Sequence, residues 1–344
     1  MTGSQKPYIS FVATSRNDNH GGDMRKRMRI FVRGLIHQCN AFQLPAELIM
    51  VEWNPPNEEP LLHEVLPQPE ADDYLRIRYI VVPEAMHHTL NFSDKLPLFQ
   101  MIAKNVGIRR AYAPFVCCTN IDLLFADALF ETLAARQLQP GHYYRANRCD
   151  IPESIDEQWE VPEMLRFSEA NILKRLGKSR FYPNFTDTTS ILFRFWGMIP
   201  VFRALSGFKR LITPPVQTKL QEMDTEACGD FTLMSKEDWL NIQGYPELEV
   251  YSLHIDSMGL LAANACNIKQ VIFPYQACTY HIRHVNGWEF DSPRERVLFF
   301  TNKPVLDWWS VYSWGKDILE KGERFNFNRP DWGLANEELE EIIV

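Results

Sequence analysis

The stretch Ala111-Tyr-Ala-Pro-Phe-Val-Cys-Cys-Thr-Asn-Ile-Asp-Leu-Leu-Phe125 joins an apolar run to a polar end. Residues 115–118 form a short apolar run that is entered from a proline, which predicts a buried strand. Polar side chains return at Asn120 and Asp122, where the strand should reach the edge of its sheet. Residues two apart in an extended segment point the same way, and ligands of open α/β sheets bind beyond the carboxyl ends of strands. We therefore expect both side chains to face a crevice; the alternative is that they cap the turn into a helix beginning near Ala126.

Outward from this stretch, apolar runs alternate with helical patterns. Strands are predicted at residues 7–13, 46–52, 76–82, 143–147 and 271–273, and helices at residues 24–39, 96–107 and 254–265. This alternation is typical of an α/β fold with a mostly parallel, doubly wound central sheet flanked by helices. From residue 304 an aromatic-rich segment with Trp308, Trp309 and Trp314 predicts a C-terminal helical and aromatic extension.

Composition narrows the classes of partner and compartment. The 344 residues carry a formal net charge of −8, with 45% hydrophobic and 23% charged residues, as in ordinary soluble globular proteins. The acidic balance argues against a nucleic-acid partner, which normally requires a basic surface, so we expect none. The seven cysteines lack metal-ligand spacing, no secretory pattern stands at the start, and no apolar run is long enough to span a bilayer. These features predict a cytoplasmic protein with reduced thiols.

The segment 193–211 mixes large apolar residues such as Phe195 and Trp196 with basic ones. Three interpretations fit this composition: a core helix, a lid over a binding cleft, or a surface patch at a membrane interface. Gly197 and Pro200 interrupt the apolar residues, and interfacial helices usually have no such interruptions. A core helix or a lid is therefore favoured. A peripheral contact with a membrane stays open as the third interpretation.

A polar loop follows the first expected strand. Its four leading residues are Ser15, Arg16, Asn17 and Asp18. They stand where a strand gives way to a helix whose amino terminus attracts phosphate, and Gly21-Gly22 would let the backbone approach a ligand closely. Glu52, at the end of the second expected strand, is the type of acceptor that binds ribose hydroxyls or a base edge. A generic polar loop and a solvated strand end are the alternatives for these two features.

In combination, these motifs resemble the GT-A glycosyltransferases, most of all the inverting family 2 type. The family pattern has a polar loop after the first strand, a carboxylate after the second, a helix leading into a D-x-D motif, a turn, an acidic pair on a helix and a late histidine. The matching positions here are Ser15-Arg-Asn-Asp18, Glu52, Lys104-Asn-Val-Gly-Ile-Arg-Arg-Ala111, Asn120-Ile-Asp122, Gly244-Tyr-Pro-Glu247, Ile255-Asp256 and His281. The resemblance covers residues 7 to 285, so it is more specific than any single motif.

The resemblance implies a GT-A-like fold and an inverting glycosyltransferase. Such an enzyme moves a sugar from a UDP- or GDP-sugar donor to a glycan or lipid-linked acceptor by a single displacement. The nucleotide-sugar-binding half would be residues 1–125, and residues 126–300 would form the acceptor-binding and catalytic half of the same domain. Residues 301–344 would be the C-terminal extension.

The resemblance also implies roles for individual residues. Donor contacts are implied for Ser15, Arg16, Asn17, Asp18, Glu52, Lys104, Asn105, Arg110, Asn120 and Asp122. A divalent ion, Mn²⁺ or Mg²⁺, would be held by Asp122 and His281, with His284 equally available as a ligand. Asp256 would be the base that takes the proton of the acceptor, and Asp230 is the rival base or a contact to a sugar hydroxyl.

Two positions depart from the family pattern. Asn120 stands where the family has the first Asp of D-x-D, and Ile255 stands where it has Glu. Asn can still form hydrogen bonds but adds no negative charge for a metal, so the metal is less strongly implied than the nucleotide site. For single residues, plainer interpretations stay open: Asp256 as a favourable charge at a helix amino terminus, and His281 as a structural histidine.

Two other functions remain open. A sugar-phosphate nucleotidyltransferase would share the nucleotide half, but that class usually carries a glycine-rich basic loop, and residues 15–22 contain only one basic residue. A catalytically inactive carbohydrate-binding protein would fit the two departures, although the retained Asp122 and Asp256 argue against it. The transferase interpretation requires Glu52, Asp122 and Asp256 to line one pocket at the rim of the sheet.

Overall fold

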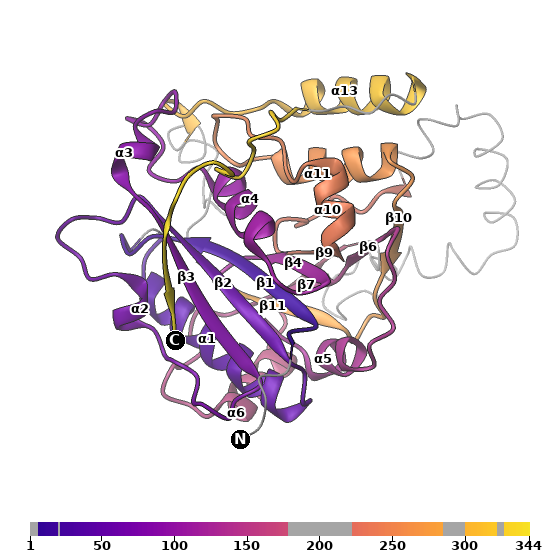
Figure 1. Ribbon diagram of the computed structural model, residues 1–344. Coiled ribbons are helices and arrows are strands. Elements are labelled where there is room, and N and C mark those ends of the chain that lie inside the picture. Colours follow the sequence, from indigo (N-terminus) through magenta and orange to yellow (C-terminus); the bar gives the residue numbers. More distant parts are fainter. Residues whose placement is uncertain (1–5, 20, 178–221, 285–299, 322–326) are drawn as a thin grey trace, which may run out of the picture.

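The larger of the two sheets formed by the described residues organises the molecule (Figure 1). The computed structural model describes residues 6–19, 21–177, 222–284, 300–321 and 327–344. The larger sheet has eight strands in the order β10-β6-β9-β4-β1-β2-β3-β12. Their bounds are β1 Ile9–Ser15, β2 Ala46–Trp53, β3 Leu75–Val82, β4 Phe115–Thr119, β6 His142–Arg145, β9 Phe231–Ser235, β10 Lys269–Ile272 and β12 Glu340–Ile343.

The pairing of these strands is mostly parallel. β1 runs parallel to both β2 and β4, β2 to β3, and β6 to β10. Two strands run the other way: β9, inserted between β4 and β6, and β12, on the outer edge of β3. The prediction of an α/β fold with a mostly parallel central sheet is therefore confirmed, with an antiparallel strand in its second half that the doubly wound pattern does not contain.

Helices cover both faces of the larger sheet (Figure 1). The helix bounds are α1 Met24–Ala41, α2 Leu62–Val65, α3 Glu84–His87, α4 Gln100–Arg110, α5 Asp127–Ala134, α6 Val161–Ala170, α10 Lys236–Ile242, α11 Ile255–Ala265 and α13 Trp308–Lys321. α1 and α5 share one core cluster with Phe11 of β1, whereas α4, α10 and α11 share another with Val12. Successive strand residues point to opposite faces, so these two neighbours in β1 belong to different cores.

A smaller sheet lies at one end of the larger one. Its order is β5-β11-β7-β8, and its bounds are β5 Leu123–Phe125, β7 Asn147–Ile151, β8 Lys174–Leu176 and β11 Cys278–Ile282. The chain passes from the larger sheet into the smaller one after β4, after β6 and after β10. Residues 120–122 make the first of these passages, so the Asn-Ile-Asp motif stands where the two sheets meet.

Gly107 lets α4 pack closely against β1. A Cβ atom at this position would lie 2.4 Å from Cγ1 of Val12, so glycine is required although it is costly inside a helix. We expect Gly107→Ala to destabilise the protein by about 1–3 kcal/mol, as overpacked cores do, measured by urea unfolding. The double variant Val12→Ala/Gly107→Ala should be less destabilised than the sum of the single variants. Strict additivity of the two changes would contradict this account of the glycine.

The C-terminal segment adds a strand to the edge of the larger sheet. β12 pairs with β3, and Glu341 of β12 forms an ion pair with Arg78 of β3 at 3.0 Å. Arg110 of α4 donates hydrogen bonds to the carbonyl oxygens of Gly333 and Leu334 at 2.8 Å each. β12 was not predicted, because its glutamates are typical of a solvated segment. Charged residues are nevertheless common on edge strands, where they prevent pairing with other chains.

Candidate active site

A cavity of about 750 Å³ opens where the two sheets meet, which is within the usual size of a ligand pocket. Segments far apart in the sequence supply its walls: the end of β1, the β4–β5 passage, β7, the loop before β9, α11 and β11. Its polar and charged lining residues include Arg16, Asp18, Arg27, Asn120, Asp122, Arg148, Asp230, Asp256, His281 and His284.

Of the three carboxylates expected in one pocket, two line this cavity. Asp122 and Asp256 are lining residues, whereas Glu52 is not among the described residues that line it. Glu52 is fully buried, and its Oε2 accepts a hydrogen bond from the backbone N–H of Leu62 at 2.8 Å. The expected common pocket therefore holds for Asp122 and Asp256, and Glu52 instead binds the start of α2.

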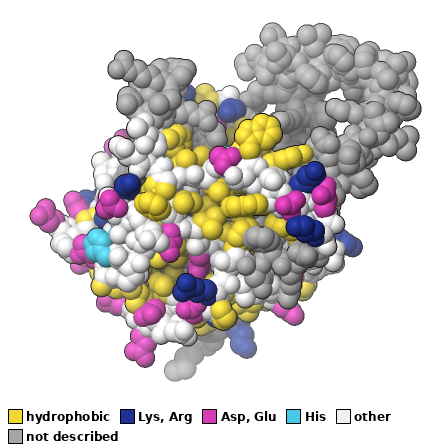
Figure 2. Space-filling view, turned by 90° about the horizontal axis from the view of Figure 1, so that it is seen from above, with side chains coloured by type: hydrophobic (Ala, Val, Ile, Leu, Met, Phe, Trp, Pro, Cys, Tyr) yellow, Lys and Arg dark blue, Asp and Glu magenta, His cyan; other side chains and the backbone are white. Residues whose placement is uncertain are grey.

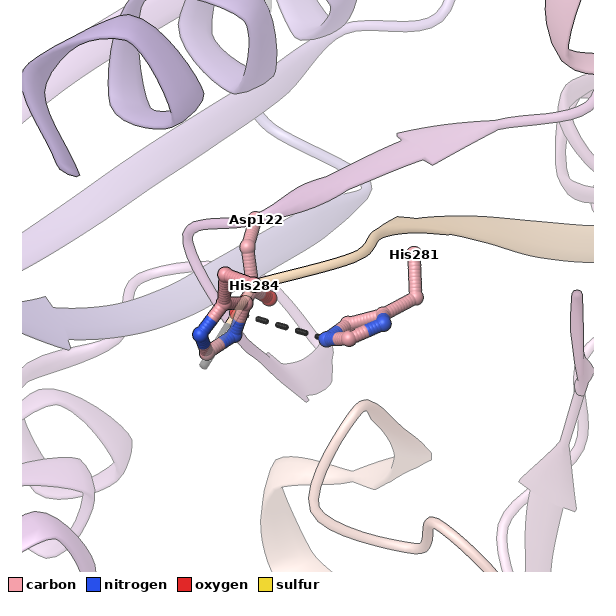
Figure 3. Close-up of side chains that lie close together, drawn as sticks. All are labelled: Asp122, His281 and His284. Atoms are coloured by element: carbon pink, nitrogen blue, oxygen red, sulfur yellow. Dashed lines mark hydrogen bonds and ion pairs between the residues drawn. The ribbon is translucent and has the colours of Figure 1, made fainter. Parts of the chain in front are cut away.

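Asp122 lies against two histidines (Figure 3). It follows β4, whereas His281 belongs to β11 and His284 follows that strand. Oδ2 of Asp122 is 2.8 Å from Nε2 of His284 and 3.6 Å from Nε2 of His281. A hydrogen bond of 2.9 Å from the N–H of Ile282 to the carbonyl oxygen of Asp122 fixes the two segments together.

This triad fits a divalent cation. One ligand atom from each of Asp122, His281 and His284 lies within 4.8 Å of the others. The second carboxylate oxygen of Asp122, Oδ1, is buried and has no hydrogen-bond partner among the described residues, so it is available to a ligand. Imidazole nitrogens suit first-row transition metals, whereas carboxylate oxygens suit Mg²⁺ and Mn²⁺.

Residues of the triad shift one another's pKa values. Burial alone would raise the pKa of Asp122, but His281 and His284 hold it well below its usual range. Burial likewise lowers the pKa of His281, yet the Asp122 carboxylate and hydrogen bonds to Asp122 and Asp150 raise it to about 9. A carboxylate that stays ionised next to two imidazoles is poised to exchange their protons for a metal ion.

A second layer of charged residues orients the triad. Nδ1 of His281 lies 3.2 Å from Oδ1 of Asp150, which in turn lies 2.6 Å from Nε of Arg148. Arg148 also reaches Oδ2 of Asp230 at 3.3 Å. Although burial would raise the pKa of Asp150, His281 and Arg148 lower it to about 2. A carboxylate behind a ligating histidine fixes its ring orientation and tautomer, as in many metal sites.

The side chain of Asn120 is held at both ends. Its Oδ1 accepts hydrogen bonds from Lys104 at 2.8 Å and Gln100 at 2.9 Å, and its Nδ2 donates to Oδ1 of Asp230 at 2.7 Å. Lys104 is fully buried, and burial lowers its pKa. An aspartate at position 120 would bring a second carboxylate against Asp230 in place of this donated hydrogen bond, which explains why an amide fits here.

Asp230 and Asp256 have different surroundings. Asp230 is held by Asn120 and Arg148, whereas Asp256 stands in the first turn of α11 and accepts a hydrogen bond from the N–H of Ser257 at 2.8 Å. A Cβ atom at Gly229 would lie 3.0 Å from Oδ2 of Asp256, so the glycine allows the loop before β9 to approach this carboxylate.

The remaining predicted residues divide between the cavity and the scaffold. Arg16 and Asp18 line the cavity and form an ion pair at 3.4 Å. Asn105 binds the backbone of Tyr245 through both its amide nitrogen and its amide oxygen at 2.8 Å. Besides Glu52, five of the predicted donor contacts lie in hydrogen bonds to backbone or neighbouring side chains and are not among the described lining residues: Ser15, Asn17, Lys104, Asn105 and Arg110.

Arg27, Arg148 and Asp150 were not singled out from the sequence. Arg27 is only 4% exposed and lines the cavity from α1. It falls on the same helix face as Met24, Met28 and Phe31, and a charge inside an apolar stripe is a signal that could have found it. The two β7 residues offer no comparable signal, because their place depends on the pairing of β7 with β11.

Arg25, Arg29 and Arg33 form a basic stripe along α1. Arg25 pairs with Glu59, and Arg29 pairs with Glu157 at 3.6 Å. Arg33 donates to the carbonyl oxygen of Trp159 at 3.0 Å. The stripe therefore ties α1 to the loops around it.

Burial also perturbs Glu52, and this can be tested. Removal from water raises the pKa of Glu52 from 4.5 to about 7, although the Leu62 N–H opposes the shift. Because the folded state then holds a proton that the unfolded state has lost, stability should fall as pH rises from about 4.5 to about 7. We expect Glu52→Gln to flatten this dependence, by about 3 kcal/mol at most, in urea unfolding at several pH values. Glu58→Gln, at an exposed position in the loop that follows β2, is the control, and an unchanged pH profile in Glu52→Gln would contradict the expectation.

Two expectations from the sequence concern membranes: a membrane contact of segment 193–211 and the lack of a membrane-spanning helix. The segment 193–211 lies outside the described residues. Among the helices within the described ranges, none has the length and apolar character needed to cross a bilayer.

Comparison with known proteins gives a resemblance in three dimensions only. No protein-family model and no curated protein matches this sequence. The catalytic domain of Drosophila β1,4-galactosyltransferase 7, in complex with xylobiose, is similar over 90% of this chain and 79% of its own, with 8% identity and a TM-score of 0.35. GalNAc-T7 with UDP, GalNAc and Mn²⁺ is similar over 94% of this chain and 52% of its own, with 11% identity and a TM-score of 0.43. This chain thus spans about half of the GalNAc-T7 chain, and neither similarity assigns it to a family.

Proposed function

We propose that the protein is a metal-dependent, inverting glycosyltransferase with a GT-A-like fold, which uses a UDP- or GDP-sugar donor. The observation that carries this proposal is that Asp122, joined to two histidines, and Asp256, at the start of α11, line one cavity at the junction of the two sheets. In a single displacement at an anomeric carbon, a bound cation can stabilise the leaving diphosphate and a separate carboxylate can take the proton of the acceptor.

The donor would bind at the ionic side of the cavity. Arg16 and Arg27 are the cations near the end of β1 and the start of α1, and they would contact the diphosphate. Asp122, His281 and His284 would hold the metal ion. When bound, a divalent ion neutralises the negative charge that develops on the diphosphate leaving group. The two imidazoles favour Mn²⁺ over Mg²⁺, because Mg²⁺ prefers oxygen ligands.

Asp256 would act on the acceptor. Its carboxylate takes the proton from an acceptor hydroxyl while that oxygen forms a bond to the anomeric carbon. The bond between that carbon and the donor phosphate oxygen breaks, and its electron pair leaves with the nucleoside diphosphate. Attack from the side opposite the leaving group inverts the configuration. Asp230 is already engaged by Arg148 and Asn120, so we assign it to sugar hydroxyls rather than to proton transfer.

The compartment proposed for this reaction is the cytoplasm. All seven cysteines are free thiols, and six of them are buried. Unpaired cysteines are the usual state in a reducing compartment. The acceptor would be a glycan or a lipid-linked molecule that carries a free hydroxyl.

Donor turnover separates the candidate functions. The protein would be incubated with UDP- and GDP-sugars, and release of nucleoside diphosphate would be measured with Mn²⁺ and with EDTA. The proposal predicts release that EDTA stops. Formation of pyrophosphate from a nucleoside triphosphate and a sugar phosphate would instead identify a nucleotidyltransferase. Donor or sugar binding with no turnover under any condition would indicate an inactive binding protein.

A further inference from the structure

Aromatic side chains line part of the cavity. Trp308, the first residue of α13, lines the cavity together with Tyr251 and His254. Its side chain is 42% exposed, and its ring centroid lies 5.1 Å from that of His254. An indole that is packed on one neighbour yet remains accessible within a cavity offers a flat apolar surface to a ligand.

The position of Trp308 is fixed relative to Asp256. The N–H of Tyr251 donates to the carbonyl oxygen of Pro304 at 2.8 Å, and Tyr251 and Val305 form a parallel bridge. Asp307 accepts the N–H of Ser310 at 3.0 Å, which caps the start of α13 just before Trp308. His254, on which Trp308 packs, directly precedes α11 and stands two residues before Asp256.

The charged and the aromatic residues of this lining suit different ligands. Asp122, Arg148 and Asp230 are charged and suit the diphosphate and metal of the donor. The Trp308 indole suits a pyranose ring, because the C–H groups on one face of a sugar are apolar and pack on aromatic rings while its hydroxyls remain free for hydrogen bonds.

We propose that Trp308 is the stacking platform for the sugar ring of the acceptor, which is therefore a carbohydrate. This inference rests on the proposed function, because it places the acceptor hydroxyl between Trp308 and the base Asp256. The sugar stacks on the indole, and one of its hydroxyls points to the Asp256 carboxylate. Trp308 then determines the affinity for the acceptor and leaves binding of the donor unchanged.

A membrane surface is the competing occupant of this face. Figure 2, which views the molecule from the side on which α13 lies, shows hydrophobic side chains gathered beside charged ones. Trp309 and Trp314 of α13 are 77% and 37% exposed. However, the exposed charges of α13 are of both signs, Lys316 and Lys321 with Asp317 and Glu320, whereas interfacial helices are rich in cations. This balance favours a carbohydrate over a bilayer.

The test compares Trp308→Leu with Trp308→Phe and with Trp309→Leu as the matched control on the same helix. The probes are cellobiose, lactose and N,N′-diacetylchitobiose at millimolar concentration, and saturation-transfer NMR measures their binding. Truncation of an aromatic anchor typically costs more than about 1 kcal/mol, so we expect affinity to fall about fivefold or more in Trp308→Leu. Trp308→Phe should retain most of the affinity, and Trp309→Leu should bind like the wild type.

The outcomes separate this inference from the proposed function. Failure of the wild type to bind any of the three disaccharides, or equal binding by Trp308→Leu and the wild type, would overturn the platform. A second result would also overturn it. If Trp308→Leu no longer sedimented with phosphatidylcholine/phosphatidylglycerol vesicles but still bound the sugars, α13 would be a membrane contact. The proposed function is judged separately, in the wild type, by release of nucleoside diphosphate from the donor with Mn²⁺ and with EDTA.

Discussion

Asp256→Asn is expected to lower turnover by about a hundredfold or more and to leave the affinity for the donor unchanged. The amide keeps the size of the side chain and can still accept the Ser257 N–H, but it cannot take the proton of an acceptor hydroxyl. Turnover would be measured as nucleoside diphosphate release with saturating donor and acceptor, and donor affinity by calorimetry. If Asp256 is the base, turnover must fall while the affinity for the donor stays unchanged.

The alternative role of Asp256 gives a different result. As a favourable charge at the start of α11, it would contribute only about 0.3–1 kcal/mol to stability and nothing to turnover. Asp127→Asn is the matched control, because Asp127 is an acid in the first turn of α5 and is not among the described residues that line the cavity. Equal loss of stability in both variants with full turnover in Asp256→Asn would identify a helix-terminal charge. Collapse of donor affinity in Asp256→Asn would identify a structural residue.

Asp122→Ala is expected to lower turnover by about two to three orders of magnitude, the typical cost of removing a group that stabilises charge in the transition state. The change removes the only carboxylate of the triad and leaves His281 and His284 without their shared partner. Affinity for Mn²⁺ should fall in calorimetric titrations, and so should affinity for the donor in the presence of Mn²⁺.

Two controls make the Asp122 result specific. Asp122→Asn retains the shape of the side chain, so added Mn²⁺ should restore part of its turnover but none of that of Asp122→Ala. His284→Ala should weaken Mn²⁺ binding as His281→Ala does, since both imidazoles contact the same carboxylate oxygen. Wild-type turnover in Asp122→Ala would remove the metal role from this residue.

Much of the fold could be predicted from apolar periodicity. Strands β1, β2, β3 and β4 and helices α1 and α11 lie close to their expected ranges, because each buries a continuous run or one face. What could not be predicted depends on partners distant in sequence. β9 enters the sheet between β4 and β6 with the antiparallel direction, and β12 returns to the edge of β3. Nothing local in either segment specifies its neighbour.

The residues of the candidate site were likewise predictable only in part. Asn120, Asp122, Asp256 and His281 could be singled out because they stand in motifs with a characteristic order. Their partners Arg148 and Asp150 come from β7, which meets β11 only in the folded sheet. Asn105 and Arg110 also stand in a motif, but their hydrogen bonds join α4 to Tyr245 and to the C-terminal segment. Residue type and spacing could not distinguish such scaffold contacts from ligand contacts.

The most direct measurement is a crystal structure with Mn²⁺ and whichever nucleotide sugar is turned over, with the metal located by anomalous scattering at the manganese edge. The account predicts manganese bound by Asp122, His281 and His284, in contact with the diphosphate, and the anomeric carbon of the sugar facing the Asp256 carboxylate. Manganese bound to other residues, or a donor whose diphosphate lies against Asp256, would contradict it.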